Sequence, residues 1–183
     1  MTAQEFPFHS MKSEALEKIS EPLYSTATYP KGGVSSLSFS FCSPTDLNVS
    51  NIRNGALSEP QRFEMIGLTM RPVPGLLCPE HALQRYLRLR ILGTYKFYIG
   101  MKPYSCGPLD HILDCSDLPS AAIRIGERFW PVTVMDKSGN LFPLYIPSLQ
   151  QFSLEARWEH PYEAPCDLPL RLYVVGSRFR EVC

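Results

Sequence analysis

The sequence predicts an all-β protein, a sandwich or barrel around one hydrophobic core. Proline makes up 17 of the 183 residues, roughly 9%, against an average of about 5% in proteins. Because proline is excluded from helix interiors and from the middle of sheets, prolines spread along the chain favour short strands joined by loops. Apolar and polar residues also alternate in several short runs, as in strands with one buried face. The apolar share, 44%, is enough for a single core.

Residues 1–34 are expected to form a short N-terminal helix and an extended arm, outside a β domain over residues 35–183. The segment 10–19 carries apolar residues four positions apart, which is typical of one stripe on a helix. This stripe consists of Met11, Ala15, Ile19 and Leu23. Pro22 would end the helix, and the Ser, Thr, Pro and Gly residues of 24–34 indicate a loop or arm. Packing on the chain's own domain is one alternative, but we expect the segment to become ordered mainly by contact of this stripe with a neighbouring subunit.

The first strands of the β domain are expected over residues 36–41 and 62–71, with a polar surface loop over 44–60 between them. In the first run, leucine and two phenylalanines alternate with serines. In the second run the alternation slips at Gly67, which fits a β-bulge.

A short helix is expected over residues 79–86, because Pro79 and Glu80 are favoured residue types in a first helical turn. The run 86–91 alternates as a strand would, so helix and strand remain open for it. After Gly93, a strand is expected over 95–101.

In the C-terminal half, alternating apolar and polar residues predict strands over 128–135, 141–146, 152–158 and 170–175, which gives about eight strands in all. The first two are expected to pair as a hairpin across a turn at 136–140. Gly176 is expected to end the last strand. The residues expected in the core are Phe63, Met65, Phe97, Ile99, Phe152, Leu154, Leu170, Leu172 and Val174.

Charge excludes a general attraction to nucleic acid, because the formal net charge is zero and the pI is near 6.9. Residues 71–102 nevertheless hold six basic side chains and one acidic one, Glu80. The basic residues are Arg71, Arg85, Arg88, Arg90, Lys96 and Lys102, and they interleave with Tyr86, Tyr95, Phe97 and Tyr98. The part over 85–102 is a candidate for weak genome contact through phosphates and stacked bases. A solvated face, or an interface with an acidic neighbouring subunit, is the alternative interpretation.

Cysteine and histidine residues give a weak metal-site candidate. Cys106, His111 and Cys115 lie in one expected loop, and Cys78 and His81 lie upstream. Their spacing matches no standard zinc finger or ribbon, so no bound metal is expected. The six cysteines are expected to be reduced thiols, because a chain of this size needs no disulfide staples.

Motifs of catalysis and of membrane insertion are missing from the sequence. No Gly-x-Ser-x-Gly elbow and no glycine-rich phosphate loop occurs, so neither an enzyme nor a cofactor is expected. No run of about 18 apolar residues occurs, so no membrane span is expected either.

Several segments together resemble capsid proteins of small tailless icosahedral phages, over roughly residues 60–180. They are Ile99–Leu109 (IGMKPYSCGPL), Phe129–Val132, Ile146–Ala156, and Leu170–Gly176 followed by Arg178. The resemblance implies a single jelly roll, an eight-stranded double-sheet barrel that assembles into a shell. It also implies contacts with copies of itself and with other virion proteins, through the sides and the N-terminal arm, in a virion assembled in the host cytoplasm.

One departure concerns the N-terminus: residues 1–70 carry five basic and seven acidic side chains. Many genome-packaging capsid proteins have a basic arm there, so this composition argues against genome binding by the arm.

Three functional hypotheses follow from the sequence. The first is a virion structural protein, a self-assembling capsid subunit. The second is a β-sandwich binding module for a glycan or a protein partner, which would be a stable monomer with an exposed aromatic groove. The third is an enzyme or zinc protein that uses Cys106, His111 and Cys115. Oligomeric size separates the first hypothesis from the second.

Overall fold

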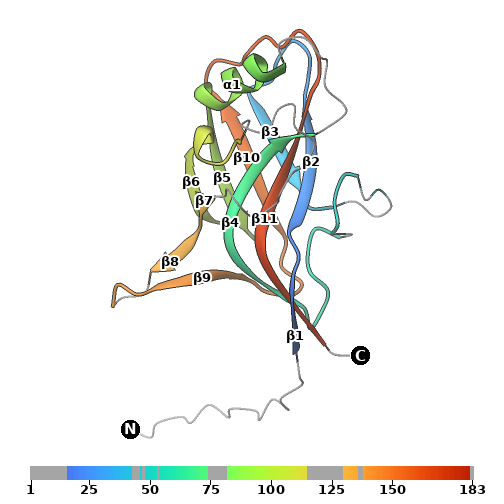
Figure 1. Ribbon diagram of the computed structural model, residues 1–183, viewed down its shortest axis with the longest axis vertical. Helices are drawn as coiled ribbons and strands as arrows, with labels where there is room; N and C mark the ends of the chain where they lie inside the picture. Colours follow the sequence, from blue (N-terminus) through green and yellow to red (C-terminus); the bar gives the residue numbers. More distant parts are fainter. Residues whose placement is uncertain are drawn as a thin grey trace, which may run out of the picture.

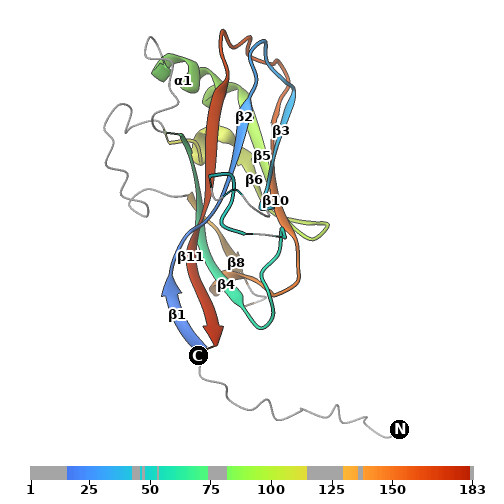
Figure 2. The same ribbon diagram turned by 90° about the vertical axis from the view of Figure 1, so that its right-hand side faces the viewer.

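The computed structural model describes residues 16–42, 46, 48–52, 54–73, 82–114, 130–135 and 138–181. In these residues two antiparallel sheets form a sandwich, which confirms the all-β prediction (Figure 1). The larger sheet contains β1 (Leu16–Ser20), β2 (Leu23–Tyr29), β4 (Arg62–Pro72), β7 (Trp130–Pro131), β8 (Thr133–Met135), β9 (Leu141–Ile146) and β11 (Leu168–Glu181). The smaller sheet contains β3 (Ser36–Ser40), β5 (Gly93–Ile99), β6 (Lys102–Pro108) and β10 (Phe152–Trp158). Helix α1 (Ala82–Leu92) lies at one end of the sandwich, and a short 3-10 turn (Leu109–His111) follows β6 (Figures 1 and 2).

Strands β11 and β10 are the central strands of the two sheets. β11 pairs with β1 and β2 along one edge and with β4 along the other. β10 pairs with β3 and β5, and β6 completes the smaller sheet beside β5. On the other edge of β4, β7 and β9 pair with different parts of that strand, and β8 pairs with β9.

The core lies between the two sheets and contains all nine residues that the sequence places there. None of the nine is more than 3% exposed. Aromatic rings pack within and between the layers. Within the smaller sheet the rings of Phe41 and Phe152 lie 4.5 Å apart, and between the sheets Tyr29 meets Trp158 edge-on at 4.9 Å. The strands predicted over 36–41, 62–71 and 152–158 are therefore correct in position and in facing.

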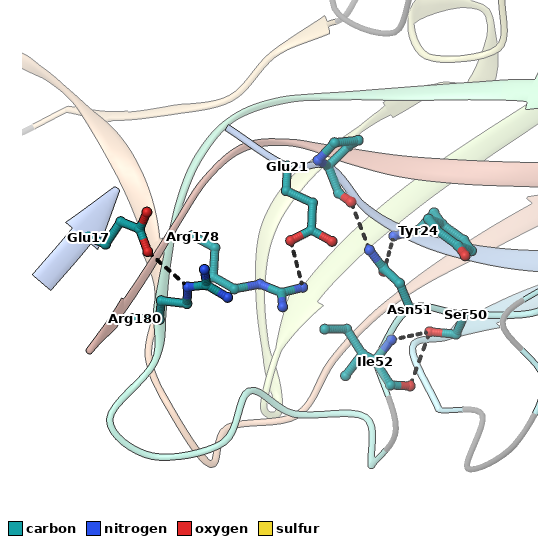
Figure 3. A network of polar contacts seen from close by, with 9 residues as sticks. Glu17, Glu21, Tyr24, Ser50, Asn51, Ile52, Arg178 and Arg180 are labelled. Carbon is teal, nitrogen blue, oxygen red and sulfur yellow. Dashed lines mark hydrogen bonds and ion pairs between the residues drawn. The ribbon is translucent and has the colours of Figure 1, made fainter. Parts of the chain in front are cut away.

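The helix expected over residues 10–19 is wrong where the structure describes it. Leu16–Ser20 is strand β1, paired with Ser177–Glu181 of β11; residues 10–15 lie outside the described part. An isolated helix of ten residues is marginal in water, whereas the edge of β11 offers a full ladder of hydrogen bonds. Two ion pairs, each 3.1 Å, also link the strand to its neighbours: Glu17 to Arg180 (Figure 3) and Lys18 to Glu64.

The loop expected over 24–34 is also wrong in its first half, which belongs to β2. Leu23 and Tyr29 at the two ends of β2 are fully buried, so this segment is part of the core rather than an arm. Serine is tolerated inside because the Ser25 hydroxyl donates to the carbonyl oxygen of Ser40, 2.8 Å away. The polar composition of this segment is therefore compatible with a strand, because its buried hydroxyl group is hydrogen-bonded.

Gly176 does not end the last strand, since β11 continues to Glu181. A Cβ atom at this position would collide with the backbone carbonyl of Glu64 and the ring of Phe63, so only glycine lets β4 approach. The register between β11 and β4 shifts here, with Ile66 as the extra residue. The bulge that the sequence suggests at Gly67 is thus present, one residue earlier.

The two remaining differences concern α1 and β6. The ambiguous run 86–91 is helical, with Tyr86 and Leu89 buried against the end of the sandwich. Residues 102–108, expected as a loop, form edge strand β6. The hairpin expected over 128–146 is confirmed in its described part as β8 and β9.

Replacement of Phe152 by alanine is expected to lower the free energy of unfolding by about 3–5 kcal/mol, because the side chain is buried between the sheets. Urea denaturation measures the loss. Phe142→Ala is the matched control: this ring is largely exposed, and its loss is expected to cost less than about 1 kcal/mol. Equal losses for both variants would contradict the assignment of the core.

Deletion of residues 1–30 is expected to prevent folding, because it removes the buried β2 and leaves one edge of β11 unpaired along Leu168–Val174. Deletion of residues 1–20 removes β1 but keeps β2, so we expect a folded protein with a lower melting temperature. Circular dichroism during heating measures both. Cooperative unfolding of the longer deletion at the wild-type temperature would show that β2 is dispensable.

Candidate assembly surface

The β8–β9 hairpin leaves the body of the sandwich and projects to its side (Figure 1). Only the end of β9 is attached: Leu144–Ile146 pairs with Phe63–Met65 of β4, whereas Leu141–Pro143 pairs only with β8. Leu144 and Ile146 are buried and anchor the hairpin. Its outer half therefore has no second strand beside it in the described part of the chain.

Large apolar side chains of β9 face solvent. Leu141 and Phe142 of the projecting half are 62% and 48% exposed, and Tyr145 of the attached half is 51% exposed. No residue from Ser138 to Leu149 is charged, whereas the turn before this segment contains Asp136 and Lys137. An exposed strand normally carries polar residues on its solvent face, so this composition indicates a surface that another molecule covers.

More apolar surface lies next to the hairpin. Ten large hydrophobic side chains are exposed among the described residues, and six of them belong to the hairpin or its neighbours. These six are Ile66, Trp130, Leu141, Phe142, Tyr145 and Leu149. Backbone contact joins the neighbouring strands, because the Val132 amide donates to the Ile66 carbonyl oxygen at 3.1 Å. A group of exposed apolar side chains in and around one hairpin is typical of an interaction site.

Two edge strands on the same side of the sandwich, one in each sheet, differ in protection (Figure 1). Edge strand β6 carries Lys102, Pro103 and Pro108, residue types that discourage pairing with another strand. Edge strand β8, Thr133–Met135, contains neither a charge nor a proline. In the described part of the chain β8 has a neighbour on one side only, so its outer backbone edge is open to pairing.

A buried ion pair attaches residues 112–114, which precede β7 in the chain, to β4. Arg71 on β4 lies 3.4 Å from Asp114, and both are mostly buried. Backbone hydrogen bonds join the same segment to Met70, one from the Met70 amide to Ile112 and one from the Asp114 amide to Met70. The edge of β4 is thus lined in turn by residues 112–114, β7 and β9.

The basic residues expected to form one face do not gather on one surface. Arg71 is buried in the ion pair just described, and Arg85 donates to the Cys166 sulfur at 2.9 Å. Arg88 lies over the ring of Tyr162, whereas Lys96 is exposed on β5 of the smaller sheet. Genome contact through residues 85–102 stays a prediction.

The aromatic residues of that segment are mainly core residues and give no stacking platform. Tyr86, Tyr95 and Phe97 are buried, so the alternation of aromatic and basic residues records the inner and outer faces of α1 and β5. Burial raises the pKa of Tyr95, whose hydroxyl lies 3.0 Å from the Ser105 hydroxyl.

The cysteine and histidine candidates are only partly described. Cys106 is exposed on β6, and His111 stacks on Trp130 with ring centroids 4.0 Å apart. Cys78, His81 and Cys115 lie outside the described residues. Within the described part, no three histidine, cysteine or acidic side chains are grouped as metal ligands would be. The expectation that no metal binds stays a prediction.

Comparison with protein-family models, with curated proteins and with solved structures finds no match to this chain. What the chain does must therefore be inferred from its own geometry. No helix in the described part is long and apolar enough to cross a membrane.

The sequence predicts the hairpin but not its projection. Consecutive apolar residues in Leu141–Ile146 are a signal that both faces of the strand are covered. The sequence does not show that only three residues of β9 attach to β4.

Asp114→Ala is expected to lower the free energy of unfolding by about 3 kcal/mol, because the substitution leaves the Arg71 charge buried. Glu155→Ala removes the exposed partner of Arg157 on the smaller sheet and is expected to change stability little. Chemical denaturation of both variants checks the difference, and similar costs would contradict the role of the Arg71–Asp114 pair as an anchor.

Proposed function

We propose that this chain is a virion structural protein, a jelly-roll capsid subunit that assembles with copies of itself into an icosahedral shell. The order of strand pairing carries the proposal. β2 pairs with β11, β3 with β10, β4 with β9 and β5 with β6. These nested pairs make one ribbon, and the pairing of β11 with β4 and of β10 with β5 folds that ribbon into two sheets. A jelly roll is a double sheet of this kind, built from two Greek keys.

Two of the three additional strands, β1 and β7, fit the same eight positions, whereas β8 lies beyond β9 at the edge of the larger sheet. β1 continues the line of β2 along β11 after a break at Glu21–Pro22. β7 continues the line of β9 along β4, next to the bulge. Both therefore extend strands of a jelly roll and do not add layers to it.

A fold alone does not determine function; the uncovered β8–β9 hairpin favours self-assembly among the activities that a jelly roll can have. Shell subunits need side surfaces that fit copies of themselves. The resemblance of the chain to capsid proteins of small tailless icosahedral phages supports the same assignment. Localisation in a virion that assembles in the host cytoplasm is part of the proposal.

The N-terminal strand is proposed as a second contact region. β1 lies along the end of β11, at the end of the sandwich opposite α1 (Figure 2). The ion pair from Glu17 to Arg180 is half-exposed at both partners, and Glu21 lies 3.6 Å from Arg178 (Figure 3). Such surface pairs contribute little and weaken in salt, so the half-exposed charges along β1 are proposed to contact a neighbouring subunit.

The test of the proposal is the size of the assembled protein. Purified full-length chain is expected to form closed particles of uniform diameter, measured by light scattering and by negative-stain electron microscopy. The sedimentation coefficient at several concentrations serves as a second measurement. A monomer at every concentration would contradict the proposal and favour a binding module for a glycan or a protein.

A further inference from the structure

We propose that a cavity between the end of β11 and residues 54–61 binds a neutral saccharide, with Arg178 as the central hydrogen-bond donor. The cavity has a volume of about 430 Å³, which is within the range of small-molecule sites. Both Arg178 and Leu149 line it together with residues 54–61. Binding is a property of one subunit, so the proposal adds to the proposed assembly and does not depend on it.

Arg178 continues the core-facing side of β11. Side chains two residues apart along a strand point to the same face. Leu172 and Val174, which precede Arg178 at this spacing, are fully buried. The inward side of the strand therefore ends in a guanidinium group that is only 17% exposed. Because a guanidinium in such a place has lost most of its water, its N–H groups need other acceptors.

Two of these N–H groups have no acceptor in the described part of the chain. Nε and Nη2 of Arg178 are both buried without a hydrogen bond. The Glu21 carboxylate lies 3.6 Å from Nη2, too far for a hydrogen bond (Figure 3). Nε and Nη2 lie on the same side of the guanidinium plane and can hold two oxygen atoms at once. The cavity that Arg178 lines is the space from which such oxygens can approach.

The other walls of the cavity offer donors, acceptors and an apolar contact. Asn54 and Gln61 contribute amide groups, which both donate and accept. Ser58 contributes a hydroxyl and Glu59 a carboxylate. Leu149, 68% exposed, adds an apolar side chain. A sugar ring matches this combination, because its hydroxyl groups donate and accept and its C–H groups pack against apolar side chains.

Charge favours a neutral saccharide over an anion. The Glu21 carboxylate already lies beside Arg178, and Glu59 adds a second carboxylate to the walls. A carboxylate or phosphate ligand would place a third negative charge near these two, and like charges at short distance repel. Hydroxyl oxygens satisfy the N–H groups of Arg178 without this repulsion.

Hydrogen bonds hold the walls of the cavity in place. Asn51, which also lines it, accepts from the Tyr24 amide and donates to the Pro22 carbonyl oxygen, each at 2.9 Å (Figure 3). The Leu149 amide donates to the Leu57 carbonyl oxygen at 2.8 Å. Leu149 has a φ of 60°, a conformation that leucine rarely adopts and that is found most often at functional sites. A site that is already ordered loses less entropy when a ligand binds.

Saturation-transfer NMR of the full-length chain tests the site. The probes are glucose, galactose, mannose and N-acetylglucosamine, with acetate and glucuronate as anionic comparisons. At least one neutral sugar is expected to bind, and glucuronate is expected to bind more weakly than glucose. Comparison of each bound sugar with its methyl glycoside distinguishes the source: binding of both forms indicates a sugar within a glycan, whereas binding of the free form alone indicates a free sugar.

Variants assign the binding to the cavity. Arg178→Lys retains the charge but loses the paired donors, and it is expected to weaken sugar binding about tenfold or more. Gln61→Ala is expected to weaken it several-fold. Arg180→Lys is the matched control: this side chain is 54% exposed, pairs with Glu17 and is not part of the cavity wall, so binding is expected to be unchanged. Circular dichroism verifies that all three variants fold.

Three results would overturn the proposal: none of the four sugars binds, acetate binds more tightly than every sugar, or Arg178→Lys binds sugar as the wild type does. Sugar binding by a chain that forms no particles would support this site and contradict only the capsid function.

Discussion

The pairing of the last strand with the first is the constraint on which the rest of the structure depends. β11 supplies 14 residues to the centre of the larger sheet, and β1 and β2 cover one of its edges while β4 covers the other. Its inward side chains, Leu170, Leu172 and Val174, are fully buried against the smaller sheet. Because strands from both ends of the chain form this ladder, the larger sheet is complete only when the whole chain is present. This long-range pairing also implies slow folding relative to a helical protein of equal size.

The same constraint produces the exposed hairpin. β4 is committed to β11 along its whole length, so its outer edge receives three short segments in turn: residues 112–114, β7 and β9. The bulge at Ile66 turns β4 at the junction between two of them, where the Val132 amide bonds to Ile66. Along β4, β9 attaches to the residues before this junction and β7 to the residues after it. Strand β8 and the outer half of β9 are left to pair with each other, away from the core.

The sequence predicts the fold well where burial alone controls the pattern. Phe97 and Leu154 alternate with polar neighbours along β5 and β10, and the two strands pair with each other at these residues. Prediction fails where side-chain hydrogen bonds or backbone packing replace hydrophobicity. The segment around the buried Ser25 is polar enough to suggest a loop, although it forms β2. A glycine such as Gly176 suggests a strand end, although here it is required for the close approach of β4. The candidate surface was predictable only in part: the sequence indicates the hairpin, but the separation of its outer half from β4 depends on long-range strand pairing.

A cryo-electron microscopy reconstruction of the assembled protein tests the central claim most directly. We predict closed particles whose subunit density follows the two described sheets, with β2 beside β11 and with an adjacent subunit covering the exposed β8–β9 hairpin. Particles in which each hairpin stands free in solvent would contradict its assignment as an assembly surface. A chain that forms no particles under any condition would contradict the proposed function itself.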